Sequence, residues 1–347
     1  MSESAPTFDE WKRLYQASIV FKDLAPWEWM EETDVFGIQN PETEELGFVS
    51  IMGLLGEHLA LALYLGVKGL QAFWELEEGT AEPSLELSTL PNHLQASFED
   101  RDELTKRDIK VIKKLSLKFR GHQVWPLFRS YRPGFLPWDL EAQEARFLTR
   151  ALEQAVDVAL RFKQDPELLT PGDGDTYLVR VPRKEKGDLV WEDQIVTVPP
   201  VEPDPIPNSV SVAELEAVKL LPRDQRVVEM DLFVSPVCIQ GKGTRPYMPY
   251  MLLSVDRASG LILAYKLFEA EETPQQTWNL VPASVLQQIE TMKAVPSRLL
   301  VGSPLLLHLV QTLADDLGLP IELTNHLPNL AQAREALLQY AHRDGDK

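Results

Sequence analysis

The chain has 347 residues, of which 44% are hydrophobic and 25% charged, ordinary values for a globular protein long enough to form two domains. Its formal net charge of −19 disfavours nucleic acid as a partner, because binding to the phosphate backbone requires Lys and Arg. The sequence contains no zinc-spaced Cys/His cluster, phosphate loop, nucleophile elbow, HExxH or GxGxxG motif, which argues against the enzymes that depend on them.

Nothing in the sequence predicts secretion or a membrane segment. Residues 1–11 lack the basic and apolar regions of a signal peptide. The most apolar stretch, 47–73, is interrupted by Glu57, His58 and Lys68, whereas a spanning helix needs about 20 apolar residues. We therefore expect a cytoplasmic protein. The one cysteine, Cys238, falls in a predicted strand and is expected to be a buried, reduced thiol.

The first half of the sequence predicts an α+β domain over residues 1–198. Apolar residues at three- and four-residue spacing predict a helix at 8–24, which Pro26 ends. A turn at 40–45, with Pro41 in an early turn position, predicts a hairpin between two short strands. The other predicted elements are helices at 57–76, 102–119 and 140–162, the last with Asp139 as N-cap, strands at 94–98 and 123–131, and a hairpin of 176–182 with 189–198.

Four tryptophans of this half each stand beside a proline or an acid: Trp27, Trp29, Trp125 and Trp138. We interpret them as side chains that cap a small core. The functional alternative is a groove that binds a protein partner, because tryptophan is enriched at interfaces.

Residues 11–162 also carry distinctive segments, above all MGLLGEHLALALYLG and WPLFRSYRPG. With these segments the region resembles an uncharacterised domain family of bacterial proteins, a domain of unknown function. The resemblance implies an architecture but no activity, cofactor or catalytic residue.

Residues 199–207 read PPVEPDPIP, with five prolines in nine residues. This composition favours an extended, stiff connector. We therefore predict a linker at 199–210 between a first domain at 1–198 and a second domain at 211–347.

The second half predicts a short helix at 212–219 and then three antiparallel strands at 226–238, 247–255 and 261–268. Helices at 274–292, 304–317 and 329–341 follow, separated by strands at 297–301 and 321–324. The order β-β-β-α-β-α-β-α predicts an α/β domain with a mixed sheet flanked by helices. In element order and turn position, residues 226–340 resemble the ribonuclease H-like superfamily, whose active members hold divalent metal ions with acidic residues.

The resemblance implies an acid on the first strand, where Asp231 stands with Glu229 on the same strand face. A second acid is expected at the end of the fourth strand, where this chain has Gly302 and Ser303. Glycine has no side chain to bind a metal, and a serine hydroxyl is a poor substitute for a carboxylate. One of the required acids is therefore missing.

Two further acids have the right places in the predicted helices: Glu335 in the last helix and Glu290 in the first helix after the strands. Both are equally explained as exposed helix charges. Asp256 lies in the turn between the second and third strands.

We therefore predict a non-enzymatic binding or adaptor protein with a catalytically degenerate ribonuclease H-like domain, an unidentified protein partner and no cofactor. The alternative is a metal-dependent nuclease or phosphoesterase that uses Asp231 with Glu229 and either Glu335 or Glu290, and Mg²⁺ or Mn²⁺.

Overall fold

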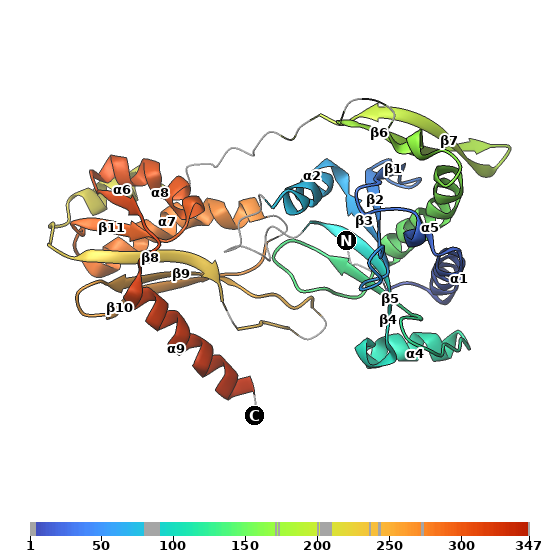
Figure 1. Ribbon diagram of the computed structural model, residues 1–347. Helices are drawn as coiled ribbons and strands as arrows, with labels where there is room; N and C mark the ends of the chain where they lie inside the picture. The colour runs from blue at the N-terminus through green and yellow to red at the C-terminus, as the bar shows by residue number, and fades with distance from the viewer. Residues whose placement is uncertain are drawn as a thin grey trace. The chain divides into compact units, whose positions relative to one another are not determined.

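The computed structural model describes residues 5–79, 91–170, 172, 174–199, 201, 210–235, 237–241, 244–271 and 274–345 (Figure 1). Contacts divide these residues into two compact units: 5–79, 91–132 and 137–201 form the first, and 133–136 and 210–345 form the second. Most of the predicted proline-rich linker, residues 200 and 202–209, lies outside the described residues. Within the described ranges, no helix combines the length and the apolar character that crossing a membrane requires.

A seven-stranded mixed sheet forms the centre of the first unit. Its neighbouring strands are antiparallel except for one parallel pair, β1 with β6. In spatial order the strands are β5 (Trp125–Tyr131), β4 (His93–Glu99), β3 (Ala60–Leu65), β2 (Leu46–Met52), β1 (Phe36–Gln39), β6 (Thr176–Glu185) and β7 (Asp188–Thr197).

Helices cover both faces of this sheet (Figure 1). On one face α1 (Phe8–Leu24), α4 (Lys106–Lys114) and α5 (Ala142–Phe162) pack into the largest apolar core. On the other face α2 (Gly66–Glu77) buries Leu70 and Phe73 against the strands. Side chains alternate between the faces of a strand, so each face supplies its own apolar layer.

The segment predicted as one helix at 57–76 divides into strand β3 and helix α2, so that prediction was wrong. Residues 60–65 pair with β2 on one side and β4 on the other, and five of the six are buried. A strand buried on both faces is a continuous apolar run that periodicity does not separate from a helix. Gly66, with φ of 68°, makes the change of direction between the two elements.

Three smaller predictions also need correction. The helix expected at 102–119 is shorter, because α4 begins after the cap Thr105 and ends at Lys114. The N-cap of α5 is Glu141 and not Asp139. Cys238 is exposed and lies outside the strands, so it is not a buried thiol.

Short 3-10 turns of the first unit lie at Pro26–Glu28, Arg101–Glu103 and Pro166–Leu169.

The second unit contains a five-stranded mixed sheet with the spatial order β10-β9-β8-β11-β12. The first three strands pair antiparallel, and β11 runs parallel to both β8 and β12. The elements follow the predicted chain order after α6 (Val212–Lys219): β8 (Val227–Val234), β9 (Tyr250–Asp256), β10 (Ile262–Phe268), α7 (Pro274–Met292), β11 (Arg298–Val301), α8 (Pro304–Leu317), β12 (Ile321–Leu323) and α9 (Pro328–Gly345). The predicted mixed sheet is confirmed.

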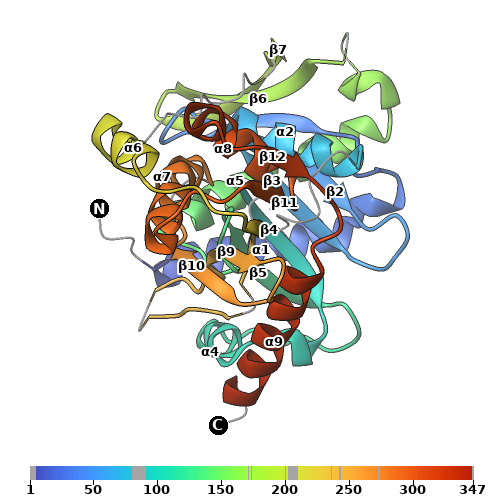
Figure 2. The ribbon, with the colours of Figure 1, turned by 90° about the vertical axis from the view of Figure 1, so that its left-hand side faces the viewer.

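The helices of the second unit lie on opposite faces of this sheet (Figures 1 and 2). Val228, Met230 and Leu232 of β8 face α6, α7 and α8, with which they form one apolar core. The alternate residues of β8 face α9, whose Leu330 packs against Phe233. Glu229 and Asp231 alternate with the first set, so they lie on the α9 face, as their spacing predicted.

Candidate functional site

Two carboxylates lie two residues apart on the α9 face of β8. Glu229 is 0% exposed and Asp231 is 9% exposed. Charged side chains are rarely buried without partners, because leaving water costs an ionised group several kcal/mol. The partners of these two side chains therefore decide what this part of the molecule does.

Both carboxylate oxygens of Glu229 have strong donors. Arg257 Nη1 donates to Oε1 at 2.9 Å, and the backbone N–H of Leu330 donates to Oε2 at 2.8 Å. Leu330 lies in the first turn of α9, where backbone N–H groups are free and the helix dipole favours an anion. Arg257 is held in turn, because its backbone carbonyl accepts from Asn329 Nδ2 at 2.7 Å. Glu229 thus fastens α9 to the sheet.

Asp231 has weaker partners. Its Oδ1 accepts the backbone N–H of Leu232 at 2.9 Å, and its Oδ2 lies 3.8 Å from Nη1 of Arg334 on α9. The Arg334 guanidinium lies 4.3 Å from the ring centroid of Phe233. Burial raises the pKa of Asp231 to about 6, although Leu232 and Arg334 act in the opposite direction. A carboxyl group with this pKa has the protonation behaviour of a general acid or base.

The Asp231 carboxylate lies directly against Gly302, at the end of β11. A Cβ atom at Gly302 would lie 2.8 Å from Asp231 Cγ and Oδ2 and 2.9 Å from Oδ1. A residue larger than glycine at this position would therefore require the Asp231 carboxylate to shift. Ser303 is also committed, because its buried Oγ accepts the N–H of Leu306 at 3.1 Å as the N-cap of α8. In the conformation seen here, the Asp231 carboxylate thus occupies the space that a side chain at position 302 would need.

The remaining sequence-predicted acids do not join this pair. Glu335 is exposed on α9, and its neighbour Arg334 is the side chain that reaches Asp231. Glu290 is exposed on α7, which packs on the opposite face of the sheet. Asp256 accepts the N–H of Ser259 at 2.9 Å and also its hydroxyl, and these hydrogen bonds lower its pKa.

Among the residues that the structure describes, no group of three or more His, Cys, Asp or Glu side chains is arranged to hold an ion. The pair on β8 accordingly supplies two carboxylates, one of them already used by Arg257 and α9.

The four tryptophans singled out in the sequence lie at separate places in the first unit. Trp27, Trp29 and Trp125 pack against the large core. Each ring also lies beside a cation, at 5.7 Å for Trp27 and Lys22, 3.8 Å for Trp29 and Lys163, 5.9 Å for Trp125 and Arg101, and 5.2 Å for Trp138 and Arg107. These contacts are those of core-capping side chains. A partner-binding role for them stays a prediction.

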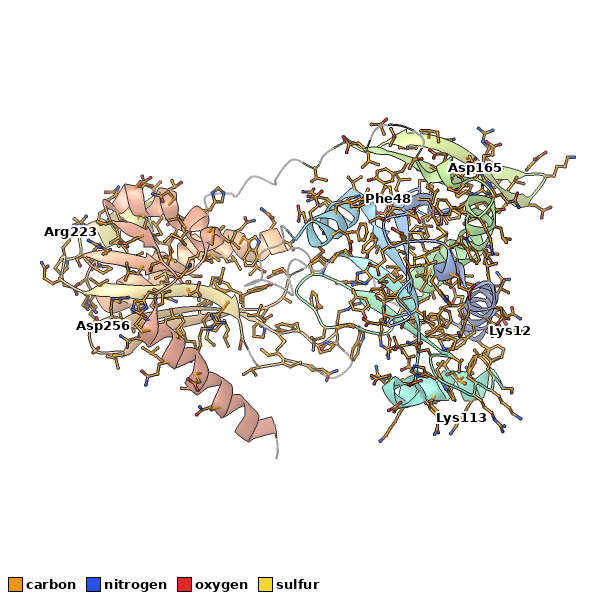
Figure 3. All side chains as sticks on the ribbon, in the orientation of Figure 1. Lys12, Phe48, Lys113, Asp165, Arg223 and Asp256 are labelled. Atoms are coloured by element: carbon orange, nitrogen blue, oxygen red, sulfur yellow. The ribbon has the colours of Figure 1, made fainter. Side chains whose placement is uncertain are left out.

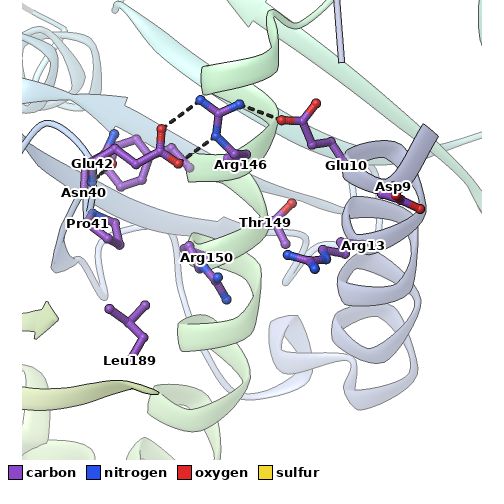
Figure 4. Close-up of a pocket in the computed structure, with 11 residues that line it drawn as sticks. Asp9, Glu10, Arg13, Asn40, Pro41, Glu42, Arg146, Thr149, Arg150 and Leu189 are labelled. Carbon is purple, nitrogen blue, oxygen red and sulfur yellow. Dashed lines mark hydrogen bonds and ion pairs between the residues drawn. The ribbon is translucent and has the colours of Figure 1, made fainter. Parts of the chain in front are cut away.

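A cavity of about 290 Å³ in the first unit shows how differently charges are arranged away from β8 (Figure 4). Arg146 crosses it, donating to Glu42 at 2.6 and 2.8 Å and to Glu10 at 2.6 Å. The cavity also contains Arg13 and Arg150. Arg146 thus holds both Glu10 and Glu42 and links α5 to α1 and to the β1–β2 turn.

Arg257 and Arg334, the cations that contact the two carboxylates, were not among the site residues predicted from the sequence. Arg257 occupies the turn after β9 and Arg334 lies in the last helix. Leu330, Ala333 and Leu337 pack towards the sheet at helical spacing, which places Arg334 at the edge of the buried stripe. A second feature, visible in the sequence alone, is the group of seven Lys and Arg residues between 106 and 120.

Comparison with known proteins matches each half of the chain to an uncharacterised family. Residues 11–180 match the family described as Domain of unknown function (DUF7309), and residues 214–338 match Domain of unknown function (DUF6930). The resemblance of the first half to a domain of unknown function is thereby confirmed. No curated protein matches the chain.

Two solved structures show weak similarity. The catalytic core domain of BIV integrase has a TM-score of 0.22 and 18% identity, over 35% of this chain and 66% of that chain. A pre-cleavage Mos1 transpososome has a TM-score of 0.21 and 13% identity, over 78% of this chain and 83% of that chain. Neither similarity is strong enough to assign a function.

Proposed function

We propose that this is a non-enzymatic binding or adaptor protein whose second unit is a ribonuclease H-like domain with a closed metal site. The element order and the sheet order β10-β9-β8-β11-β12 support this assignment. The observation that carries the proposal is the contact between Gly302 and the Asp231 carboxylate, because a side chain at position 302 would require that carboxylate to move.

Electrostatics support the same conclusion. A divalent ion in such a site needs several hard oxygen ligands, and catalysis by two ions needs more. Both oxygens of Glu229 already accept hydrogen bonds, from Arg257 and Leu330. Arg334 places a positive charge near Oδ2 of Asp231, and that charge repels a metal ion. Of the β8 pair, only Asp231 could therefore offer an oxygen to a metal ion, and that oxygen lies beside the Arg334 guanidinium.

The test compares metal binding and cleavage in the full chain. Purified protein is incubated with labelled single- and double-stranded nucleic acids and Mg²⁺ or Mn²⁺, and metal binding is followed by calorimetry. We expect neither cleavage nor specific metal binding. The control pair is Asp231→Ala and Asp316→Ala, since Asp316 is an exposed acid on α8. Cleavage that persists in Asp316→Ala and disappears in Asp231→Ala would establish the nuclease alternative and overturn the proposal.

The proposal includes a cytoplasmic location and a protein partner. The acidic charge of −19 supports solubility rather than a particular partner. Capture of partners by the wild-type chain in native lysate, followed by their identification, tests this part separately from the metal question. Recovery of nucleic acid alone would contradict a protein partner.

A further inference from the structure

Helix α4 and the residues that follow it carry a dense group of cations. Between residues 106 and 120, seven of fifteen residues are Lys or Arg and one is acidic, in a chain with 34 Lys and Arg and a net charge of −19. All seven cations are exposed. We call this surface the α4 basic ridge: Lys106, Arg107, Lys110, Lys113, Lys114, Lys118 and Arg120.

The packing of α4 fixes the direction of these side chains. Ile112 is buried in the large core, with Ile109 and Leu115 packed beside it. Because the apolar stripe of the helix faces inward, the lysines project outward (Figure 3, around Lys113). The ridge is therefore a fixed feature of the fold and not a flexible tail.

The acid within the ridge does not offset its charge. Asp108 turns inward, where Arg129 donates to its two oxygens at 3.0 and 2.7 Å. Burial alone would raise the pKa of Asp108, but hydrogen bonds from Arg129 and Thr105 outweigh it and the pKa lies below its usual range. The charge of Asp108 is thus balanced by a residue outside the ridge.

Most of the ridge cations lack a counter-ion of their own. Arg107 pairs with Asp139 at 2.8 Å, and Lys114 Nζ lies 5.5 Å from the ring centroid of Phe8. Across the described ranges, Lys106, Lys110, Lys113, Lys118 and Arg120 make no ion pair. Like charges one helical turn apart repel one another. An anion that neutralises several of these side chains together therefore relieves that repulsion, which favours binding.

We propose that the α4 basic ridge binds the phosphate backbone of a nucleic acid. A nine-residue helix is about 14 Å long, and a duplex carries one negative charge per about 1.7 Å of its axis, so several phosphates fall within reach of the ridge. The net charge of the chain does not prevent this contact, because charges beyond about 8 Å are largely screened at physiological salt.

The shape of the surface favours a linear polyanion over an anionic membrane. The apolar face of α4 is already buried, so the helix has nothing to insert into a bilayer. Asp102 and Glu103, in the turn before α4, are exposed and would approach a flat anionic surface together with the ridge. A nucleic acid strand touches only a narrow strip and avoids these acids. The ridge supplies cations, which contact phosphates, so we expect binding that is independent of base sequence.

This inference does not rest on the proposed function, because the ridge belongs to the first unit and the carboxylate pair to the second. Binding without cleavage agrees with both proposals. Cleavage dependent on Asp231 would overturn the proposal of a closed metal site without affecting the proposal for the α4 basic ridge. Failure of the chain to bind nucleic acid would overturn the proposal for the ridge without affecting that of the closed metal site.

The test measures the binding of the full chain to a labelled DNA duplex of mixed sequence, by fluorescence anisotropy at several salt concentrations. If about five phosphates are neutralised, the logarithm of the binding constant falls against that of salt with a slope of about −4.5. In Lys110→Gln/Lys113→Gln the slope becomes shallower by about 2 and the affinity at low salt falls by about tenfold or more. Single-stranded RNA serves as a second probe of the same phosphate chemistry.

The matched control is Lys184→Gln/Lys186→Gln, which removes two exposed lysines near the β6–β7 turn of the same unit. We expect it to bind as the wild type does. Circular dichroism checks that all variants keep their helices. Equal losses in both double variants, an unchanged slope in the ridge variant, or binding to anionic phospholipid vesicles but not to nucleic acid would overturn the proposal.

Discussion

Glu229 and Asp231 occupy the same face of one strand, two residues apart, yet their hydrogen-bond partners differ. Glu229 is fully buried and receives two donors, one from Arg257 and one from the first turn of α9. Asp231 is nearly as buried, but it accepts one hydrogen bond and faces Arg334 at 3.8 Å. The difference shows that two buried acids on one strand face can have very different hydrogen-bond partners, and that burial with few donors raises the pKa of Asp231.

The consequence for function follows from this difference. A metal site needs carboxylates whose oxygens are free. On β8, both oxygens of Glu229 already accept hydrogen bonds, and Asp231 has no acidic side chain opposite it at position 302. Substitutions of Glu229, Asp231 and Gly302 should separate the role of Glu229 in holding α9 from the properties of Asp231, with effects that decrease in that order.

Glu229→Ala should have the largest effect. It leaves Arg257 and the N–H of Leu330 without their acceptor and loosens α9 from the sheet, at a cost of about 3 to 5 kcal/mol in the free energy of unfolding. Chemical denaturation of the full chain measures this cost. Glu322→Ala is the control, because Glu322 pairs with Arg298 with both side chains 54% exposed and should cost less than about 1 kcal/mol. Similar losses in both variants would contradict the structural role of Glu229.

Asp231→Asn should change the pH dependence of stability. The pKa of Asp231 rises from 3.8 to about 6 in the fold, so between these values the folded state holds a proton that the unfolded state has released. The contribution of Asp231 to the stability of the wild type therefore falls as the pH rises from about 4 to about 6, by up to about 3 kcal/mol, and stays lower above that range.

The Asn side chain removes this dependence and keeps an acceptor for Leu232. At pH values above about 6 the variant should be more stable than the wild type, and near pH 4 the two should converge. Denaturation midpoints measured across this range provide the comparison. A constant difference between the two proteins at every pH would show that Asp231 does not titrate as described.

Gly302→Ala should have the smallest effect, about 1 to 3 kcal/mol, because the added methyl group collides with the Asp231 carboxylate. The collision is with Cγ and both oxygens, so the same substitution in an Asp231→Ala background should cost little. A double-mutant cycle measures this coupling. If Gly302→Ala costs the same in both backgrounds, the carboxylate does not fill the space beside β11.

Local patterns predicted much of the fold. The expected helices at 8–24, 212–219, 274–292 and 304–317 have the same bounds in the structure, because caps, prolines and apolar spacing act within a few residues. The prediction at 57–76 was wrong because burial on both faces removes the alternation that identifies a strand. Only the neighbouring strands β2 and β4 show what this segment is.

The sequence by itself determined the elements of the second unit and the common face of Glu229 and Asp231, since both depend on short-range periodicity. The state of those carboxylates was decided by tertiary contacts. Leu330 lies 101 residues from Glu229, and the collision at Gly302 depends on the pairing of β11 with β8. Donors, steric closure and burial come from distant parts of the chain, so whether a carboxylate binds a metal, holds a helix or titrates is a property of the folded structure.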